Sequence, residues 1–271
     1  MGFKWGDIKM FSDLPSNFLY TAYKLVIEFS DNLGKSHFTQ GTAFVIAISS
    51  DADDFIIVTN RHMVDPNYNA PAASYKNFNL KSIIATGRRN DDSLYRFSID
   101  PKTSVYHSQD VLNDVAIFVK PLCKVIENMP TFELFYHFGL ADIADKNFFH
   151  SELFPFDVVA FAGFPQEHDQ LAERPLIRGG RIASDPKFDF SIGGKAAGQC
   201  VAYEAFAYGG SSGSPLYAPA RGFSNSPNAR VGRLIGINAG YLQNGTQHIG
   251  LSYFYRSTII LEILKENKII G

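Results

Sequence analysis

Short runs of β-branched and aromatic residues, separated by Asp, Asn, Gly and Pro, recur along almost the whole of this chain of 271 residues. Such runs are typical of strands, and the residues between them are typical of tight turns. Strands are predicted at residues 18–30, 39–49, 55–59, 81–86, 94–99, 115–120, 157–163, 176–184, 199–207, 214–217, 233–238 and 249–254. Because no helices alternate with these strands, the pattern favours an all-β chain of paired antiparallel barrels or a sandwich over any βαβ design.

One helix is predicted, over residues 257–270 at the end of the chain. Its apolar residues recur at helical spacing, and lysines lie near its end: Ile259, Ile260, Ile263, Leu264, Lys265 and Lys268. Between residues 123 and 154 the strand pattern weakens around Met129-Pro130. We therefore expect a boundary there, with one β-barrel in residues 1–130 and a second, followed by the helix, in residues 150–271.

Composition limits the classes of partner. Apolar residues make up 45% of the chain, and 25 Lys and Arg residues are balanced by 27 Asp and Glu residues, which gives a formal net charge of -2. A phosphate-backbone binding surface needs an excess of basic residues, so no nucleic-acid partner is expected. The amino terminus lacks the apolar core of a signal peptide, and no window reaches the roughly 18 apolar residues that span a bilayer. We expect no membrane association and a cytoplasmic location.

Cysteine and histidine usage argues against metal chemistry. Cys123 and Cys200 form no C-x-x-C pair and are too few for a disulfide framework. Free thiols are the first expectation, and a single Cys123–Cys200 bridge is the alternative. The seven histidines have no metal-ligand spacing, and no phosphate-binding glycine loop is present. No metal or other cofactor is expected.

The segment at residues 208–217, Y-G-G-S-S-G-S-P-L-Y, has the composition of a serine nucleophile loop. A catalytic serine needs a base and fixed N–H donors for the oxyanion, and glycines let a backbone turn its N–H groups inward. With Ser211 central, the segment matches the G-x-S-x-G of α/β-hydrolases, whose Asp or Glu lies between the serine and the histidine. No carboxylate lies between Ser211 and the last histidine, His248, so this alternative is disfavoured. With Ser212 central, the segment matches G-x-S-G-[GS]-P.

The second alternative needs a histidine and a carboxylate earlier in the chain. His62 follows an apolar strand in V-T-N-R-H-M-V, and Asp114 precedes one in L-N-D-V-A-I-F. A carboxylate in that position can accept a hydrogen bond from His Nδ1–H and fix the tautomer that acts as a base. Each residue alone is commonplace, but the order His62, Asp114, Ser212 is informative.

Together, T-N-R-H-M-V, L-N-D-V-A-I-F and G-S-S-G-S-P-L-Y resemble the three signature segments of the chymotrypsin-like (trypsin-fold) serine peptidases. G-I-N-A-G at residues 236–240 resembles the family's substrate-binding strand. The likeness is greatest to the bacterial glutamyl-endopeptidase-like and HtrA-like branch, and it covers residues 20–265. It implies two antiparallel six-stranded barrels with the active site between them. Since the sequence stops at Gly271, we expect no PDZ module and no recruitment through one.

The resemblance assigns roles residue by residue. Ser212 resembles the nucleophile, His62 the general base and acid, and Asp114 the carboxylate that orients the histidine. The backbone N–H groups of Gly210 and Ser212 resemble the oxyanion hole. Two further residues, Thr59 and Asn113, look like supporting residues.

The sequence also departs from the digestive branch of the family. Ser211 stands where those enzymes have an Asp that pairs with a newly freed amino terminus, and their disulfides are missing. Activation of the zymogen type is therefore not expected.

By analogy with the family, the residues just before the serine loop form the base of the primary specificity pocket. The strand that resembles the substrate-binding strand forms one wall, and a further strand closes the pocket. The residues at these positions are Phe206, Ala207, Ile237, Asn238, Ala239, Gly240 and His248. None is acidic, so a basic P1 side chain would be buried without a partner and is disfavoured. An apolar or small P1 residue is expected first. An acidic one read by His248 is the alternative, although Asn238 stands where glutamyl-specific enzymes have their histidine.

The sequence thus predicts a serine endopeptidase that cleaves polypeptides through an acyl-enzyme. The alternative is a catalytically silent protein of the same fold that binds a partner through the cleft. We also expect a restricted set of protein partners or a regulator, because an unregulated general protease would be toxic inside a cell.

Overall fold

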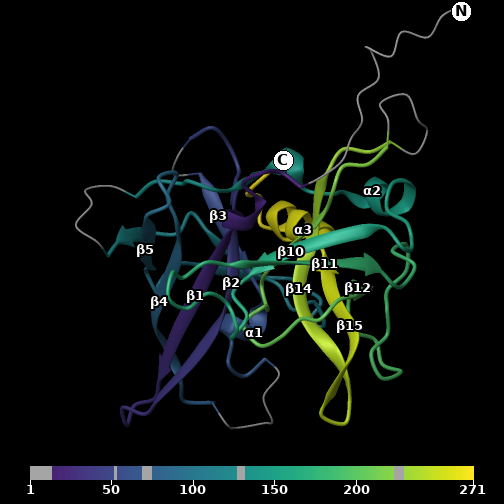
Figure 1. The fold of residues 1–271 in the computed structure, drawn as a ribbon. Coiled ribbons are helices and arrows are strands. Elements are labelled where there is room, and N and C mark those ends of the chain that lie inside the picture. Colours follow the sequence, from purple (N-terminus) through teal and green to yellow (C-terminus); the bar gives the residue numbers. More distant parts are fainter. Residues whose placement is uncertain (1–13, 52–53, 69–74, 127–131, 223–228) are drawn as a thin grey trace, which may run out of the picture.

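The computed structural model describes residues 14–51, 54–68, 75–126, 132–222 and 229–271, and it is built mainly of antiparallel strands (Figure 1). The strands of the first half are β1 (Ala22–Ser30), β2 (Ser36–Ala47), β3 (Phe55–Thr59), β4 (Asn79–Arg88), β5 (Leu94–Ile99), β6 (Val105–His107), β7 (Ala116–Val119), β8 (Cys123–Val125) and β9 (Phe138–Gly139). Those of the second half are β10 (Val158–Gly163), β11 (Leu176–Ile182), β12 (Cys200–Glu204), β13 (Pro215–Ala218), β14 (Arg233–Asn244) and β15 (Gln247–Arg256). The helices are α1 (Arg61–Val64), α2 (Lys146–Ser151) and α3 (Thr258–Glu266), with 3-10 turns at Phe18–Thr21 and Leu140–Asp142.

In the first half, the described strands form one sheet in the order β6-β7-β3-β2-β1-β4-β5-β8, with the short β9 paired in parallel to β2. Buried and partly exposed residues alternate along β1 and β5, whereas all five residues of β3 are buried. Alternation fits a sheet with one face on a core, and continuous burial fits a strand covered on both faces. β3 is thus held rigidly just before the histidine of interest.

The second half closes into a six-stranded barrel, β10-β11-β12-β15-β14-β13. Its interior is filled by apolar side chains that include Phe161, Leu216 and Phe254. Tyr203 is also fully buried there. Closure removes free strand edges, so the loops at the ends of the barrel strands are held in fixed positions.

Between the two halves lies a further core that joins both sheets to α3. The predicted terminal helix is confirmed, and its apolar stripe of Ile259, Ile260, Ile263 and Leu264 is fully buried in this core. The helix lies beside the barrel strands in Figure 1. Ile46 and Ile117 from the first half and Leu234 from the second meet there, which fixes one half against the other.

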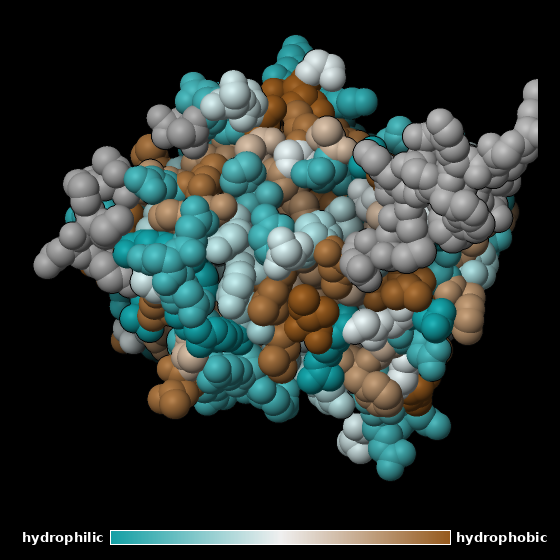
Figure 2. Space-filling model, turned by 45° about the horizontal axis from the view of Figure 1, so that its top comes forward, coloured by the Kyte–Doolittle hydropathy of each residue, from teal (hydrophilic) through white to brown (hydrophobic). Residues whose placement is uncertain are grey.

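The all-β class with a C-terminal helix is confirmed, and β3 and β5 begin and end where predicted. Several short elements, among them β6, β8, β9 and α1, were not predicted, because runs of two to four residues give too little periodicity. The Met129-Pro130 segment and the amino-terminal decapeptide lie outside the described residues. No helix in the described ranges is long and apolar enough to cross a membrane. Apolar side chains occur in separate groups among polar ones on the face seen in Figure 2, as expected for a globular chain.

Candidate active site

His62 and Asp114, which are far apart in the sequence, make two hydrogen bonds with each other. The Nδ1 atom of His62 lies 2.6 Å from Asp114 Oδ2, and the backbone N–H of His62 donates to Asp114 Oδ1 at 2.8 Å. The Asp114 side chain is 7% exposed and that of His62 is 28% exposed. Because Oδ2 accepts the proton on Nδ1, Nε2 is left with a free lone pair and can act as a base.

The local sequence explains how His62 reaches this position. The buried strand β3 ends at Thr59, and Asn60 has extended backbone angles before the single helical turn α1 begins. The Asn60 side chain is fully buried, and its Nδ2 donates to the backbone oxygen of Asp114 at 2.7 Å. Asn60 therefore joins the end of the histidine strand to the segment that carries Asp114.

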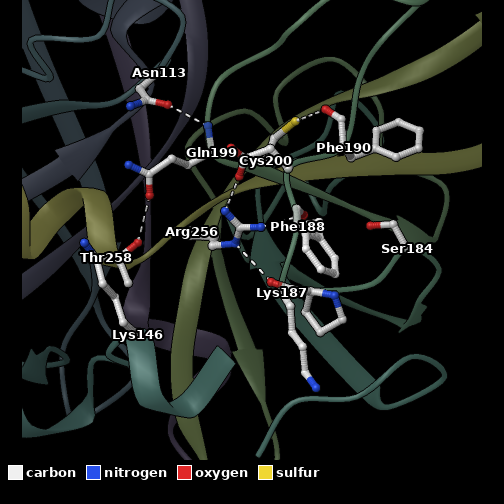
Figure 3. Close-up of polar contacts among 12 residues, drawn as sticks. Asn113, Lys146, Ser184, Lys187, Phe188, Phe190, Gln199, Cys200, Arg256 and Thr258 are labelled. Atoms are coloured by element: carbon white, nitrogen blue, oxygen red, sulfur yellow. Dashed lines mark hydrogen bonds and ion pairs between the residues drawn. The ribbon is translucent and has the colours of Figure 1, made fainter. Parts of the chain in front are cut away.

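Asn113 holds the Asp114 segment against the second half of the molecule (Figure 3). Its Oδ1 accepts from the backbone N–H of Gln199 at 2.9 Å, and its Nδ2 donates to Ser108 Oγ at 3.0 Å. The Gln199 side chain in turn bonds to Glu262 and Thr258 on α3. The expected supporting residue Asn113 thus links Asp114 to the barrel and, through Gln199, to α3.

The loop that carries Ser212 is folded tightly between Tyr208 and β13. Gly210 and Gly213 have φ angles of 92° and 83°, which L side chains rarely adopt. A Cβ atom on Gly210 would lie 2.3 Å from the Phe164 oxygen, and one on Gly213 would lie 1.9 Å from the Thr42 oxygen. Both positions therefore require glycine for space as well as for conformation.

Each carbonyl oxygen from Gly209 to Ser212 accepts a hydrogen bond from outside the loop. The donors are Gln166 N to Gly209 O (3.0 Å), Thr42 Oγ1 to Gly210 O (2.9 Å), Asn238 Nδ2 to Ser211 O (2.8 Å) and Thr42 N to Ser212 O (2.8 Å). Within the described part of the chain, the N–H groups of Gly210 and Ser212 donate to no protein acceptor. The four carbonyls from Gly209 to Ser212 are thus bonded, and two N–H donors of the same stretch are available to a ligand.

The histidine segment and the serine loop are in close contact through three residues: Gly41, Thr42 and Thr59. Thr59 Oγ1 donates to the Thr42 oxygen at 2.8 Å, and a Cβ on Gly213 would lie 2.5 Å from that hydroxyl. A Cβ on Gly41 would meet both Met63 and the Ser212 oxygen, at 2.8 Å and 3.0 Å. The residue next to His62 and the backbone of Ser212 therefore flank the same glycine.

The Ser212 hydroxyl donates to the Ala239 oxygen at 3.3 Å, and among the described contacts it makes no hydrogen bond to His62. Hydrogen bonds between a nucleophile and its base are often long without substrate and shorten in the bound complex.

No family model matches the sequence, and no curated protein matches it. Solved structures do match the fold. The protease Anisep from Arthrobacter nicotinovorans is 11% identical, with a TM-score of 0.54 over 96% of this chain and 99% of that one. The HtrA-type protease AlgW with a decapeptide is 15% identical, with a TM-score of 0.51 over 94% of this chain. The fold is that of the trypsin-like serine proteases. The chain spans 61% to 66% of the length of the AlgW chains it matches.

Within this trypsin-like fold, the predicted pocket residues fall into two groups. Ala207 and Ile237 are fully buried, with Ile237 in the core between the halves, and the Asn238 side chain is bonded to Ser211. Ala239 is also buried, and Gly240 approaches the Tyr253 hydroxyl. The accessible residues are Phe206, which is half exposed, and His248.

The rings of Phe206 and His248 have centroids 4.9 Å apart, and His248 also stacks on Tyr241 at 4.6 Å. Burial lowers the pKa of His248, and its Nδ1 accepts from the Gly250 N–H at 2.8 Å. The proton of the neutral ring is therefore on Nε2. One cation that sequence reasoning missed, Arg178, lies 4.7 Å from the Tyr208 ring and donates to the Phe206 oxygen.

A groove of about 610 Å³ borders Asp114. Its lining includes Arg61, Asp65, Leu112 and Tyr253 as well as Asp114, so it combines apolar and aromatic surface with one cation and two carboxylates. Burial, and then the nearby Asp114 charge, raise the pKa of Tyr253 to about 12. The groove lies next to the Asp114 carboxylate, and neither His62 nor Ser212 is among its lining residues.

Cys123 and Cys200 are free thiols, as first expected, and the Cys200 Sγ donates to the Phe190 oxygen (Figure 3). In the described ranges, no group of three or more His, Cys, Asp and Glu residues is arranged to hold a metal ion.

Proposed function

We propose that the protein is a serine endopeptidase in which His62, Asp114 and Ser212 form the catalytic triad. The observation that carries this proposal is that two hydrogen bonds join His62 to Asp114. The nearby serine loop has two N–H groups that donate to no acceptor among the described residues. The pair supplies a base in a fixed tautomer, and the donors supply a site for an oxyanion. These are the requirements of acyl transfer to a serine hydroxyl.

The chemistry follows from these roles. The Ser212 hydroxyl turns from the Ala239 oxygen toward His62 and attacks the substrate carbonyl carbon, and Nε2 takes its proton. Asp114 stabilises the imidazolium that forms, while the N–H groups of Gly210 and Ser212 donate to the oxyanion. The tetrahedral intermediate collapses to an acyl-enzyme as His62 protonates the leaving amine. Water activated by His62 then releases the acid and restores the hydroxyl.

The groups around Phe206 and His248 support a substrate preference against basic P1 residues. Arg178 and His248 lie there, and no carboxylate lies among the predicted pocket positions. A Lys or Arg side chain would lose its hydration without gaining a partner. We expect cleavage after apolar or small P1 residues, with acidic P1 residues as the second candidate. A peptide library with varied P1 tests this, and preferred cleavage after Lys or Arg would contradict it.

The second candidate function is a silent protein of this fold that binds polypeptides in the cleft. The absence of a Ser212–His62 hydrogen bond among the described contacts favours it. AlgW, a protein of similar fold, has a structure with a decapeptide, which makes peptide binding a reasonable property for either candidate. A restricted set of protein partners or a regulator fits both.

A fluorophosphonate probe separates the two candidates. The wild type should be labelled at Ser212, and the Ser212→Ala variant should not be. Ser211→Ala is the matched control, because this neighbouring serine is fully buried and its hydroxyl has no hydrogen-bond partner in the described structure. It should retain labelling. A folded wild type that is not labelled and cleaves no peptide would favour the silent candidate.

A further inference from the structure

The side chain of Asn238 is fully buried on β14, and protein groups bond to both ends of its amide. Nδ2 donates to the Ser211 oxygen at 2.8 Å, and Oδ1 accepts from the Tyr203 hydroxyl at 2.6 Å. The backbone of Asn238 also bonds to the serine loop, through Gly213 N–H and Ser214 O, both at 2.9 Å. Asn238 is therefore bonded to the serine loop through both its side chain and its backbone, and its amide is not available to a substrate.

The Ser211 oxygen and the Ser212 N–H belong to one peptide unit. A trans peptide is planar, so its C=O and N–H point in opposite directions, and a hydrogen bond that holds the oxygen also fixes the direction of the N–H. The peptide unit of Gly209 and Gly210 is held in the same way, by the bond from Gln166 N–H to the Gly209 oxygen. The Gly210 and Ser212 N–H groups, which donate to no acceptor among the described residues, are thus each fixed from the opposite side.

We propose that Asn238 and Tyr203 are positioning residues that aim the Ser212 N–H into the oxyanion hole. Asn238 supplies the donor that holds the Ser211 oxygen. Tyr203 determines which end of the amide faces the loop, because its hydroxyl donates to Oδ1 and leaves Nδ2 directed at Ser211. Burial raises the pKa of Tyr203, so that the hydroxyl keeps its proton across the working pH range.

This arrangement accounts for the serine at position 211. In the digestive branch of the family that this sequence resembles, an Asp at this position pairs with a freed amino terminus. Here the Ser211 hydroxyl is buried without a hydrogen-bond partner among the described residues, so its side chain does not hold the loop. The loop is held instead through the Ser211 carbonyl. Its oxyanion donors are therefore oriented without a proteolytic cut.

The inference rests on the proposed function, and Asn238→Asp tests it. The substitution keeps the size of the side chain but places a carboxylate oxygen against the Ser211 carbonyl. Loss of an oxyanion donor typically lowers kcat by about 100-fold to 1000-fold, and we expect a fall of about 100-fold with KM changed less than about 3-fold. Binding of a peptide aldehyde, whose hemiacetal carries the oxyanion, should weaken in parallel. Binding of the matching peptide amide should not change.

Two further variants keep the test decisive. Tyr203→Phe removes only the hydroxyl and should lower kcat about 10-fold, so it gives an answer even if Asn238→Asp fails to fold. Asn244→Asp, on the exposed end of the same strand, is the matched control and should leave kcat unchanged. Wild-type kcat and aldehyde affinity in folded Asn238→Asp or Tyr203→Phe would overturn this inference alone. An inactive, unlabelled wild type would overturn the proposed function as well.

Discussion

The side-chain oxygen of Asn113 accepts a hydrogen bond from the backbone N–H of Gln199, 86 residues further along the chain. Asn113 precedes Asp114, and Gln199 precedes the first strand residue of β12, Cys200, so one hydrogen bond joins the two halves at the carboxylate. A Cβ on the adjacent Gly198 would lie 2.4 Å from the same Asn113 oxygen. The position of Asp114 thus depends on contacts made by the opposite half.

Asn113→Ala should therefore destabilise the protein and lower kcat. It leaves the Gln199 N–H without its acceptor, which typically costs about 1–3 kcal/mol. Asp114 also loses a fixed neighbour. Urea unfolding and peptide cleavage measure the two effects. Ser108→Ala, which removes only the bond to Asn113 Nδ2, should cost less, and an equal loss in both variants would contradict the role given to Gln199.

Thr42→Val should reduce both stability and kcat, although it changes the side-chain volume little. The Thr42 hydroxyl accepts from Phe164 N–H at 3.0 Å and donates to the Gly210 oxygen at 2.9 Å. Valine would leave both groups unpaired, at a typical cost of about 1–3 kcal/mol for each buried group. Thr86→Val on β4 is the control, because that threonine is also buried but, in the described part of the chain, its side chain makes no hydrogen bond to the serine loop. If Thr42→Val has the stability and kcat of the wild type, the Thr42 hydroxyl is dispensable.

Gly210→Ala should abolish labelling by the fluorophosphonate probe. The added Cβ would lie 2.3 Å from the Phe164 oxygen, so the loop would have to move together with its N–H donor. Gly34→Ala shares the strained backbone region, with φ of 81°, but its Cβ would meet open space. It should cost only about 1–2 kcal/mol of stability and leave labelling intact. Equal labelling of Gly210→Ala and the wild type would exclude a rigid loop.

Cys123 and Cys200 should react slowly with iodoacetamide at pH 8 in the folded protein. Burial raises the pKa of the Cys123 thiol to about 12 and that of Cys200 to about 11, so almost no thiolate is present. In urea, both thiols should react without prior reduction. Mass spectrometry counts the added groups, and an unreactive pair in urea would indicate a disulfide.

The stability of the protein should fall as the pH is lowered below about 6.5, in part because of His107. Burial, followed by the charge of Arg61, lowers the pKa of His107 below its ordinary value of 6.5, although Asp65 and Asp114 oppose the shift. The unfolded chain then binds this proton more readily than the folded one. The stabilisation is present above about pH 6.5 and is lost as the pH falls toward the lower folded-state value.

His107→Gln checks this prediction, since it removes the titrating group. Urea midpoints measured between pH 7.5 and pH 5 should decline less steeply in the variant than in the wild type. Parallel curves would assign the acid sensitivity to other groups.

The sequence by itself determined the class of fold and the residues of the proposed triad. Alternating apolar residues fixed most strands to within a few positions, because a half-buried strand imposes a period of two on its own sequence. The motifs around His62, Asp114 and Ser212 are short and contiguous, so they could be read without coordinates.

Only the tertiary structure decided what holds the serine loop. Thr42 bonds to Phe164, 122 residues away, and Asn238 bonds to Ser211 and Tyr203, on different segments of the barrel. By sequence position, Asn238 was assigned to the wall of the specificity pocket, but its amide is directed at the Ser211 carbonyl. Such contacts depend on how strands from both halves pack and on their register, and no local pattern of residues records them.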